Sequence, residues 1–481
     1  MSGTLTFEPE ALTWPDLLRS ATQRSGDNQH WRGRSWQEWR ILTRSELGLP
    51  STDDRRDLIL ATGHQPGLWH PGILIKFMAV DQLRRELLQH GHGVDSVTCL
   101  HLVVDQDTTD PSSMDLPLRL ATGEVTVTTV HHGRVQSPST PASTHVTGMQ
   151  PPVRGVGPTT PEEMDPAVRP GALAAIHDAL QKHEAAPSLA MQYAQAAGEL
   201  MRPWVDAMQI VTATGLMDTT LAKAMVACMR EALPACIEAY NRAVALTPEA
   251  GLLPLERNEL PLWRITPKGV RRAVMINELD DVESQGETLA PRALLMTAIM
   301  RLGVSDVFVH GRGGWVYDRV MERWIEDWLS ATPMPMTMAT ADLYLPFDDL
   351  PAPGDAGEPC SVETALAHLR RQLHDPSANG SGISGAKQDW LARIEAQPRG
   401  SRERREVFFA YHNWLRKARE THRDALEAAQ RSLEAARRWE RSRAHVTRRT
   451  WAFPLYPVTA IDTLRVAVTD QFHRHEVPAA G

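Results

Sequence analysis

The sequence that decides the fold runs from residue 58 to residue 77 and reads LILATGHQPGLWHPGILIKF. Its first four residues form an apolar run typical of a buried strand. From Ile73 onward the apolar residues recur with helical spacing, at Phe77, Val80, Leu83 and Leu87. The loop between these segments carries glycines, imidazoles, an amide and an indole, namely Gly63, His64, Gln65, Gly67, Trp69, His70 and Gly72. The pattern predicts a strand, a glycine-rich loop and a helix, which together offer backbone N–H groups to an anionic ligand.

A second buried strand is predicted at residues 97–104, and it ends in Asp105-Gln106-Asp107. Residues 58–107 then form a β-loop-α-β unit, for which a parallel, right-handed crossover is favoured. The glycine-rich loop and the two aspartates both follow the carboxyl ends of their strands. In an open parallel sheet this is the edge at which ligands bind.

The strand-loop-helix arrangement recurs near residue 310. Residues 306–310 have strand character, Gly311-Arg312-Gly313-Gly314 forms a turn, and a helix is predicted from Trp315 to Leu329. Two such loops can face each other across one cleft of a single sheet. The predicted substrate- or nucleotide-binding residues are therefore Gly63, Gln65, Gly67, Trp69, His70, Gly72, His310, Gly311, Arg312, Gly313, Gly314, Tyr317 and Asp318.

The candidate catalytic residues are His64, Lys76, Asp105 and Asp107. Lys76 lies one turn into the first predicted helix, and the 51 basic residues of the chain include only six lysines. A lysine is thus a rarer choice at this position than a basic residue in general. The alternative is a solvated or snorkelling lysine without a function in the cleft.

Length, composition and charge limit the class of protein. The chain has 481 residues, of which 42% are hydrophobic and 23% charged, values ordinary for a globular protein of two or three domains. We expect a cytoplasmic protein, because no apolar run is long enough to cross a bilayer and the first ten residues do not resemble a signal peptide. A net charge of −8 argues against nucleic acid as the main partner. The four widely spaced cysteines suggest neither disulfides nor a cysteine zinc site.

The remaining pattern predicts an N-terminal segment (1–54), an α/β core with a parallel sheet (55–345), a helical arm (346–450) and a C-terminal segment (451–481). A hairpin is predicted at residues 116–130, a helical insertion fills about 171–250, and a helix should begin at Pro291. In the arm, a long helix over about 402–445 has a heptad-like seam, formed by Phe408, Tyr411, Leu415, Ala418, His422, Ala425, Ala429, Leu433 and Ala436. The seam predicts a homodimer, unless residues 362–374 and 387–395 cover it within one chain.

The order TGHQPGLWHPGILIK, a strand ending in DQD, HGRGGWVYD and a late helical arm resembles the bacillithiol biosynthesis cysteine-adding enzyme family (BshC-like proteins). The resemblance covers residues ~55–110 and ~285–345 most clearly and extends more weakly to Tyr456. Its first motif fits at Gly63, Gln65, Gly67, Leu68, Gly72 and Lys76, whereas His64 stands where a glutamine is usual. Its acidic second motif fits only at Asp105 and Asp107, and its third motif fits only in the glycines of residues 310–314.

The resemblance implies a Rossmann-like core, an inserted helical segment and a C-terminal coiled coil that pairs two subunits. It also implies a ligase that joins the carboxyl of cysteine to an amino-sugar conjugate of the glucosaminyl-malate type, with ATP or ADP and Mg²⁺ as expected cofactors. A free carboxylate does not form an amide at a useful rate, so activation by a nucleotide or as an acyl phosphate is expected. Lys76 and the loop could then hold phosphates, and Asp105 or Asp107 could hold Mg²⁺ or orient the amine.

Two other function classes remain open at this stage. A metal-dependent hydrolase would draw its ligands from His64, His70, His101, Asp105, Asp107 and His310 if the loops converge. A non-catalytic assembly protein would keep only a nucleotide-binding cleft beside its helical arm. Each histidine also has a structural alternative, with His64 as a helix cap and His101 within the sheet.

Overall fold

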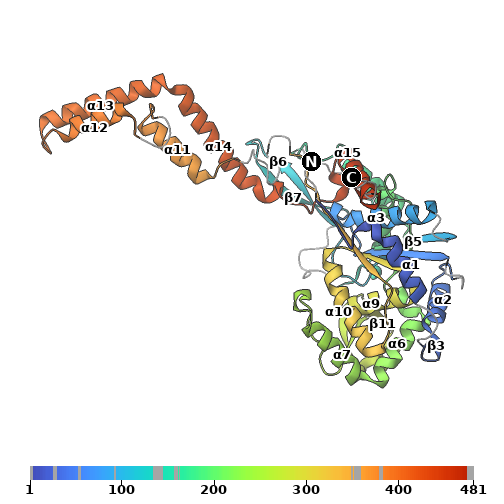
Figure 1. The fold of residues 1–481 in the computed structure, drawn as a ribbon. Helices are drawn as coiled ribbons and strands as arrows, with labels where there is room; N and C mark the ends of the chain where they lie inside the picture. Colours follow the sequence, from blue (N-terminus) through green and yellow to red (C-terminus); the bar gives the residue numbers. More distant parts are fainter. Residues whose placement is uncertain are drawn as a thin grey trace, which may run out of the picture.

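The computed structural model describes residues 4–24, 30–51, 56–90, 94–133, 145–155, 161, 163–347, 350, 359–378 and 383–473. The fold is mixed α/β, with a six-stranded, mostly parallel sheet at its centre and a helical arm that extends away from the body (Figure 1). The predicted α/β class is thus confirmed. The predicted boundary between residues 54 and 55 lies outside the described residues.

The central sheet has the strand order β1-β13-β12-β4-β5-β8. Its strands are β1 (Thr4–Glu8), β4 (Asp57–His64), β5 (Ser96–Val103), β8 (Gln209–Thr212), β12 (Val307–His310) and β13 (Met336–Asp342). All neighbouring strands pair in parallel except the edge strand β1, which pairs antiparallel with β13. The chain progresses outward from β4 through β5 to β8, whereas β12 and β13 lie on the other side of β4. The direction of winding therefore changes between β4 and β12.

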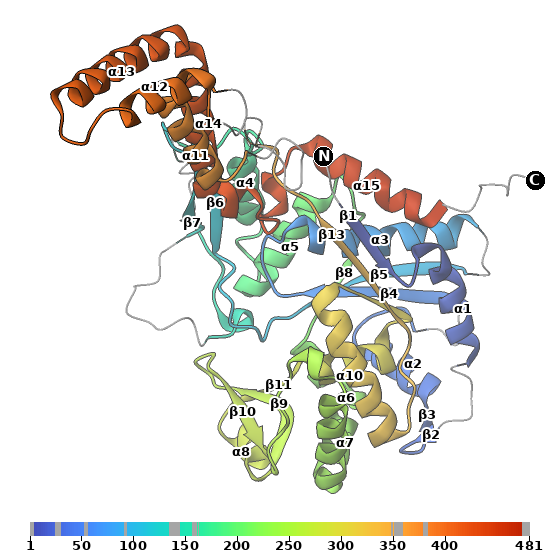
Figure 2. The ribbon, with the colours of Figure 1, turned by 60° about the vertical axis from the view of Figure 1, so that its left-hand side comes forward.

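Helices cover both faces of this sheet (Figure 2). One layer contains α1 (Trp14–Arg24), α3 (Pro71–Gln89), α4 (Ala172–Lys182), α5 (Leu189–Met201) and α15 (Val458–His473). The other contains α2 (Trp36–Glu46), α6 (Thr220–Glu231), α7 (Leu233–Ala245), α9 (Ala293–Ile299) and α10 (Arg312–Leu329). Leu58 and Leu60 of β4 pack into the first layer and Ile59 and Ala61 into the second. This alternation explains why the strand is apolar throughout.

Both predicted strand-loop-helix units are present. The first runs from β4 through α3 to β5, and the second from β12 through α10 to β13. Because β4 and β12 are paired neighbours, with Ala61 opposite Phe308, the two loops emerge side by side at one edge of the sheet. The hairpin predicted at residues 116–130 is also present, as β6 (Ser113–Arg119) and β7 (Val125–His131).

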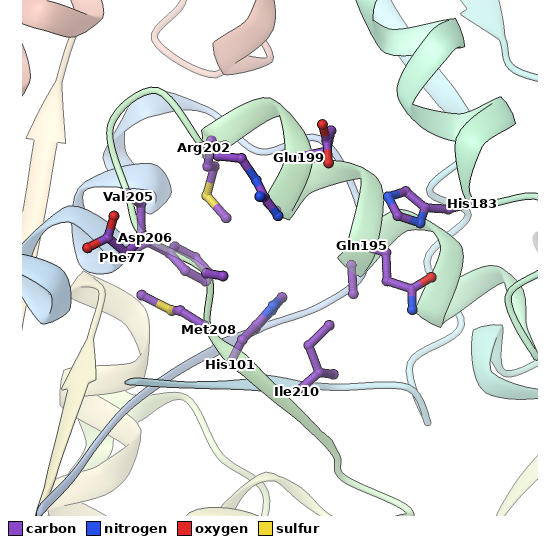
Figure 3. Close-up of a pocket in the computed structure, with 14 residues that line it drawn as sticks. Phe77, His101, His183, Gln195, Glu199, Arg202, Val205, Asp206, Met208 and Ile210 are labelled. Carbon is purple, nitrogen blue, oxygen red and sulfur yellow. The ribbon is translucent and has the colours of Figure 1, made fainter. Parts of the chain in front are cut away.

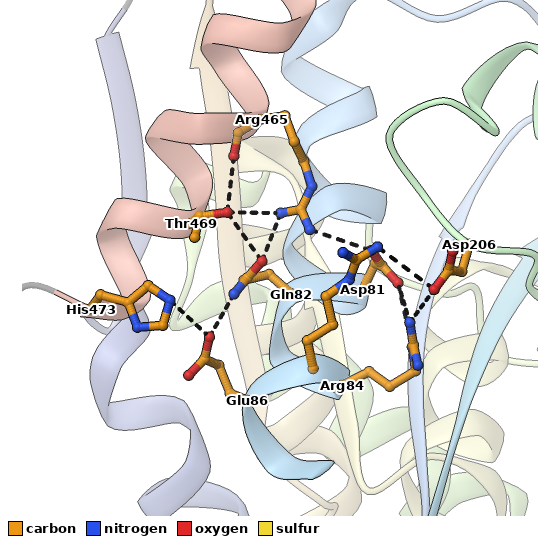
Figure 4. A network of polar contacts seen from close by, with 9 residues as sticks. Asp81, Gln82, Arg84, Glu86, Asp206, Arg465, Thr469 and His473 are labelled. Carbon is orange, nitrogen blue, oxygen red and sulfur yellow. Dashed lines mark hydrogen bonds and ion pairs between the residues drawn. The ribbon is translucent and has the colours of Figure 1, made fainter. Parts of the chain in front are cut away.

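The terminal segments are both built into the body. From α2, Arg44 pairs with the buried Asp306 just before β12, with 2.7 Å between Nη2 and Oδ2. At the other end of the chain, α15 lies along α3 and contacts it through a polar network (Figure 4). In this network Arg465 donates to the amide oxygen of Gln82 over 2.8 Å. The first and last segments therefore complete the layers around the core.

The sequence prediction was wrong at two places inside the core. The insertion at 171–250 holds four helices but also β8, a four-residue strand that extends the main sheet. The helix predicted to begin at Pro291 is present but begins two residues later, as α9 (Ala293–Ile299), because Pro291 ends β11 (Thr288–Pro291), which pairs with β9 (Glu259–Ile265). The strand β10 (Arg271–Met275) completes this small sheet on the other side of β9. A two-residue pair, β2 (His30–Trp31) and β3 (Arg34–Ser35), precedes α2, and α8 (Leu279–Ser284) precedes β11.

The arm contains α11 (Val362–His374), α12 (Gly385–Glu395), α13 (Arg402–Thr421) and α14 (Arg423–Val446). The long helix predicted over 402–445 is divided at His422, whose backbone leaves the helical conformation (φ −105°, ψ 29°). Within one chain, α11 packs on α14 and buries Leu433 and Ala436 of the predicted seam. Part of the seam is therefore covered by the chain itself. No helix in the described part of the chain is long and apolar enough to span a membrane.

Candidate functional site

A cleft of about 430 Å³ opens where the winding of the sheet changes direction, at the carboxyl ends of β4 and β12. This is the position at which open parallel sheets bind ligands. Both predicted loops line it, and they approach closely: a Cβ added to Gly311 would lie 3.6 Å from Cδ of Lys76. The predicted residues that line the cleft are Gly63, His64, Gln65, His70, Gly72, Lys76, His310, Gly311, Arg312, Gly313, Gly314, Tyr317 and Asp318.

Lys76 is the central cation of the cleft. It belongs to α3, is only 3% exposed, and donates from Nζ to the carbonyl oxygen of Gly63 over 2.6 Å. Among the described residues no carboxylate pairs with it. Burial lowers the pKa of Lys76 to about 7, because the charged form loses its hydration without gaining an opposite charge. At neutral pH this amine therefore exists in both charged and neutral forms.

His310 and Asp318 form a buried pair on the opposite side of the cleft. His310 Nε2 donates to Asp318 Oδ2 over 2.8 Å, and Arg301 Nη1 donates to the same oxygen over 2.9 Å. Burial alone would raise the pKa of Asp318, but His310 and Arg301 outweigh it and hold the pKa well below its ordinary value. Asp318 therefore stays ionised, holds the imidazole in place, and offers no free charge to a ligand.

The helix α10 begins at the cleft without a side-chain cap. Its N-cap residue is Gly311, so the first backbone N–H groups, in the Arg312-Gly313-Gly314 turn, have no capping side chain. Gly314 is required here, because an added Cβ would lie 2.5 Å from Nδ1 of His310. The turn thus brings the positive end of the helix against the imidazole ring.

The structural alternative in which His64 caps the first helix is wrong. His70, rather than His64, caps α3, since its Nδ1 accepts from the backbone N–H of Gly72 over 3.1 Å. Burial, together with the charges of Arg449 and Lys76, lowers the pKa of His70 to about 4. Burial likewise lowers the pKa of His64 well below its usual value, with the charge of Lys76 as a further cause. Both rings are therefore neutral at pH 7.

Four predicted site residues do not line the cleft, namely Gly67, Trp69, Asp105 and Asp107. Trp69 is buried and stacks on Phe77 with ring centroids 4.8 Å apart. Gly67 has a φ of +154°, which lies in the region that favours glycine and so gives it a conformational role in the loop.

The two aspartates were predicted to face the ligand, and the structure corrects this. Asp105 accepts hydrogen bonds from the backbone N–H (2.9 Å) and the hydroxyl of Thr214, directly after β8. Asp107 accepts from the backbone N–H of Thr108 over 2.7 Å and lies 4.0 Å from Arg271. Both carboxylates therefore stabilise loops at the edge of the sheet.

The ligands of the alternative metal site do not gather. His101 lies within β5 and packs edge-on against Phe77, while Asp105 and Asp107 lie outside the cleft. Across the described ranges, no group of three or more His, Cys, Asp or Glu side chains is placed to hold a metal ion.

Sequence reasoning missed several residues that reach the cleft from distant segments. Arg449 follows α14, lines the cleft and forms an ion pair with Asp342 at the end of β13. Thr297 of α9 and Thr340 of β13 also line it. None of them belongs to a local motif, so only the pairing of distant elements could reveal them.

A scan against protein-family models and a search of curated proteins both found no match to the chain.

Proposed function

We propose that the chain is an enzyme whose cleft binds a small anionic substrate and joins a carboxyl group to an amine, as in the cysteine-adding ligases that it resembles. The observation that carries the proposal is Lys76, a buried lysine without a carboxylate partner, at the ligand edge of the sheet. An anion bound beside it would restore the missing charge partner and raise its pKa again.

The energetic cost of this lysine supports a function for it. A pKa lowered from 10.5 to about 7 corresponds to a penalty on the order of 5 kcal/mol for keeping the folded lysine charged. A methionine would fill similar space without this penalty. A lysine that only filled space here would lower the stability of the fold. This lysine is therefore better explained by a function in binding an anion or in transferring a proton.

The other charges of the cleft favour an anion as well. Arg312 and the uncapped end of α10 contribute positive potential on one side, whereas Arg449 on another side is already paired with Asp342. Among the residues that the structure describes, Asp318 is the only carboxylate that lines the cleft, and His310 and Arg301 already neutralise it. A phosphate or carboxylate in the cleft would be attracted by the positive groups and only weakly repelled by Asp318.

The chemistry that fits best is attack by an amine on an activated carboxyl group. The carboxyl would first be activated, for example as an acyl phosphate formed at the expense of ATP. The amine nitrogen then forms the new C–N bond, the C–O bond to phosphate breaks, and the nitrogen loses a proton. The ring of His310, held through Nε2, could accept that proton at Nδ1. Lys76 is charged when an anion is bound beside it, so it would stabilise the charge on the leaving phosphate.

The chain's residues fit the phosphates of a nucleotide better than they fit a bound metal ion. Lys76, Arg312 and the start of α10 match phosphate oxygens in charge and hydrogen-bonding type. When present, a nucleotide would supply the activated phosphoryl group. In the described part of the chain, the cleft has no carboxylate free to hold Mg²⁺, and Asp105 and Asp107 lie outside it.

We further infer that the core is Rossmann-like and that the arm is a coiled coil through which two chains pair. Support for the first inference comes from the change of winding between β4 and β12, with crossover helices on both faces. Support for the second comes from the packing of α11 on α14 and from the exposed Phe408 and Phe409 of α13.

The test is a product assay with ATP, Mg²⁺, cysteine and an amino-sugar malate acceptor, followed by mass spectrometry of the amide and of the nucleotide products. We expect the amide with the wild-type protein and none with Lys76→Met. Lys223→Met, which changes an exposed lysine of α6, should retain full activity. Absence of product in the wild type, together with no thermal stabilisation by any phosphate or carboxylate tested, would reject the proposal.

A further inference from the structure

A second cavity, separate from the cleft, lies beside α5 (Figure 3). We call it the α5 cavity and define it by Phe77, His101, Ala194, Gly198, Met208 and Ile210, which surround its interior, with charged residues at its mouth. Its volume is about 170 Å³. Cavities of about 150 Å³ are known to hold a molecule of the size of benzene.

The interior of the α5 cavity is uncharged. The charged residues that line it are Glu199, Arg202 and Asp206, and all three are accessible to solvent. Glu199 is paired with Lys182, and Asp206 with Arg84. The part of a ligand that enters the cavity should therefore be neutral and largely apolar.

His101 supplies a polar group within these apolar surroundings. Its ring points into the cavity in Figure 3 and is only 3% exposed. Burial lowers the pKa of His101 to about 3, with the charge of Lys76 as a second cause, so the ring is neutral at physiological pH. Within the described residues, Nε2 has no hydrogen-bond partner, and the same holds for Nε2 of His183 on another wall. Buried nitrogens without a partner are uncommon because each costs about 1–3 kcal/mol.

Gly198 provides the second observation that points to a ligand. It lies in the last turn of α5, three residues before the helix ends at Met201, and a glycine within a helix is less favourable than an alanine. Packing does not require a glycine there, since no atom lies within 4 Å of an added Cβ. The helix thus leaves space open at the wall of the cavity although a side chain would be tolerated.

We propose that the α5 cavity is a binding site for a small, uncharged aromatic alcohol of about the size of phenol. The ring would occupy the space between Phe77, Met208 and Ile210, and the hydroxyl would form a hydrogen bond with the imidazole of His101. This site is distinct from the cleft that contains Lys76 and does not depend on the function proposed for that cleft.

The test compares phenol with toluene, which has nearly the same shape but no hydroxyl, by calorimetry and ligand-observed NMR on the full chain. We expect phenol to bind the wild type roughly 3- to 10-fold more tightly than toluene, the value of one net hydrogen bond. His101→Phe should lose this preference and bind toluene more tightly than phenol, because the hydroxyl would be buried without a hydrogen bond. Gly198→Met should fill the cavity and bind neither, whereas the matched control Gly198→Ala should bind both.

Two results would overturn the proposal. One is failure of phenol to bind the wild-type protein at millimolar concentration. The other is a preference for phenol that survives in His101→Phe. If His101→Phe does not fold, Gly198→Met decides, because unchanged phenol affinity in this folded variant would place the ligand elsewhere.

Discussion

At the scale of single residues, the sequence predicts the position of Lys76 but not its isolation from carboxylates. Its position in the first turns of a helix after a glycine-rich loop was predictable, and so was its presence at the cleft. Its isolation from carboxylates was not, because that depends on where distant acids lie. Asp105 and Asp107, the acids predicted to be catalytic, are turned toward Thr214 and Thr108.

Lys76→Met should therefore stabilise the protein at neutral pH. Free lysine titrates near 10.5 and folded Lys76 near 7, so between these values the unfolded chain binds more protons and wild-type stability rises with pH. Below pH 7 the full penalty applies, and above pH 10.5 it vanishes. Urea unfolding should show the variant more stable by as much as about 5 kcal/mol at pH 7, with this difference in unfolding free energy closing toward pH 10.5.

A difference independent of pH would show that Lys76 is not buried as a cation. Lys223→Met, the exposed control, should change stability by less than about 0.5 kcal/mol at either pH.

Asp105→Asn should act on stability and not on the cleft. The amide nitrogen of asparagine cannot accept one of the two hydrogen bonds that Thr214 donates, so we expect a loss of about 1–3 kcal/mol. Affinity of the folded variant for an anion such as phosphate or ATP should equal that of the wild type. A large loss of anion affinity at unchanged melting temperature would instead place Asp105 in the site.

At the scale of elements, the two strand-loop-helix units were predictable and the strand that extends their sheet was not. Apolar runs next to glycines and helical spacing identified β4, α3, β12 and α10 because each signal is local. β8 is only four residues long and lies between helices, so its pairing with β5 has no comparable local signal. That omission explains the error at Asp105, whose partner Thr214 follows β8.

The close approach of the α10 turn to His310 predicts a difference between two neighbouring glycines. An added Cβ at Gly314 would meet the imidazole at 2.5 Å, whereas at Gly313 nothing lies within 4 Å. Gly314→Ala should displace His310, lower stability by about 1–3 kcal/mol and weaken anion binding. Gly313→Ala should leave both nearly unchanged or raise stability slightly. Equal melting temperatures and anion affinities for the two variants would contradict this geometry.

At the scale of the whole molecule, the arm extends from the body and is only partly covered by its own helices (Figure 1). Leu415 is 3% exposed within one chain, so it is not available as an interface residue, whereas Phe408 and Phe409 are 49% and 68% exposed. The heptad pattern correctly located apolar positions but could not show which of them α11 and α12 cover.

We therefore expect a homodimer that depends on the exposed aromatic residues of α13. Light scattering should give the mass of two chains at micromolar concentration, and the double variant Phe408→Glu/Phe409→Glu should give one. Both side chains are exposed, so the variant should fold with an unchanged circular dichroism spectrum. A wild-type monomer at this concentration, or a dimer that persists in the double variant, would reject this interface.

The most direct test of the anion cleft is the ionisation of Lys76 itself. The chain has only six lysines, so the side-chain resonance of Lys76 can be assigned by comparison with Lys76→Met in NMR spectra of labelled protein. We expect Lys76 to have a pKa near 7 in the free protein. This pKa should rise clearly when phosphate, ATP or a substrate carboxylate binds. A pKa close to 10.5 in the free protein that no anion changes would contradict this prediction.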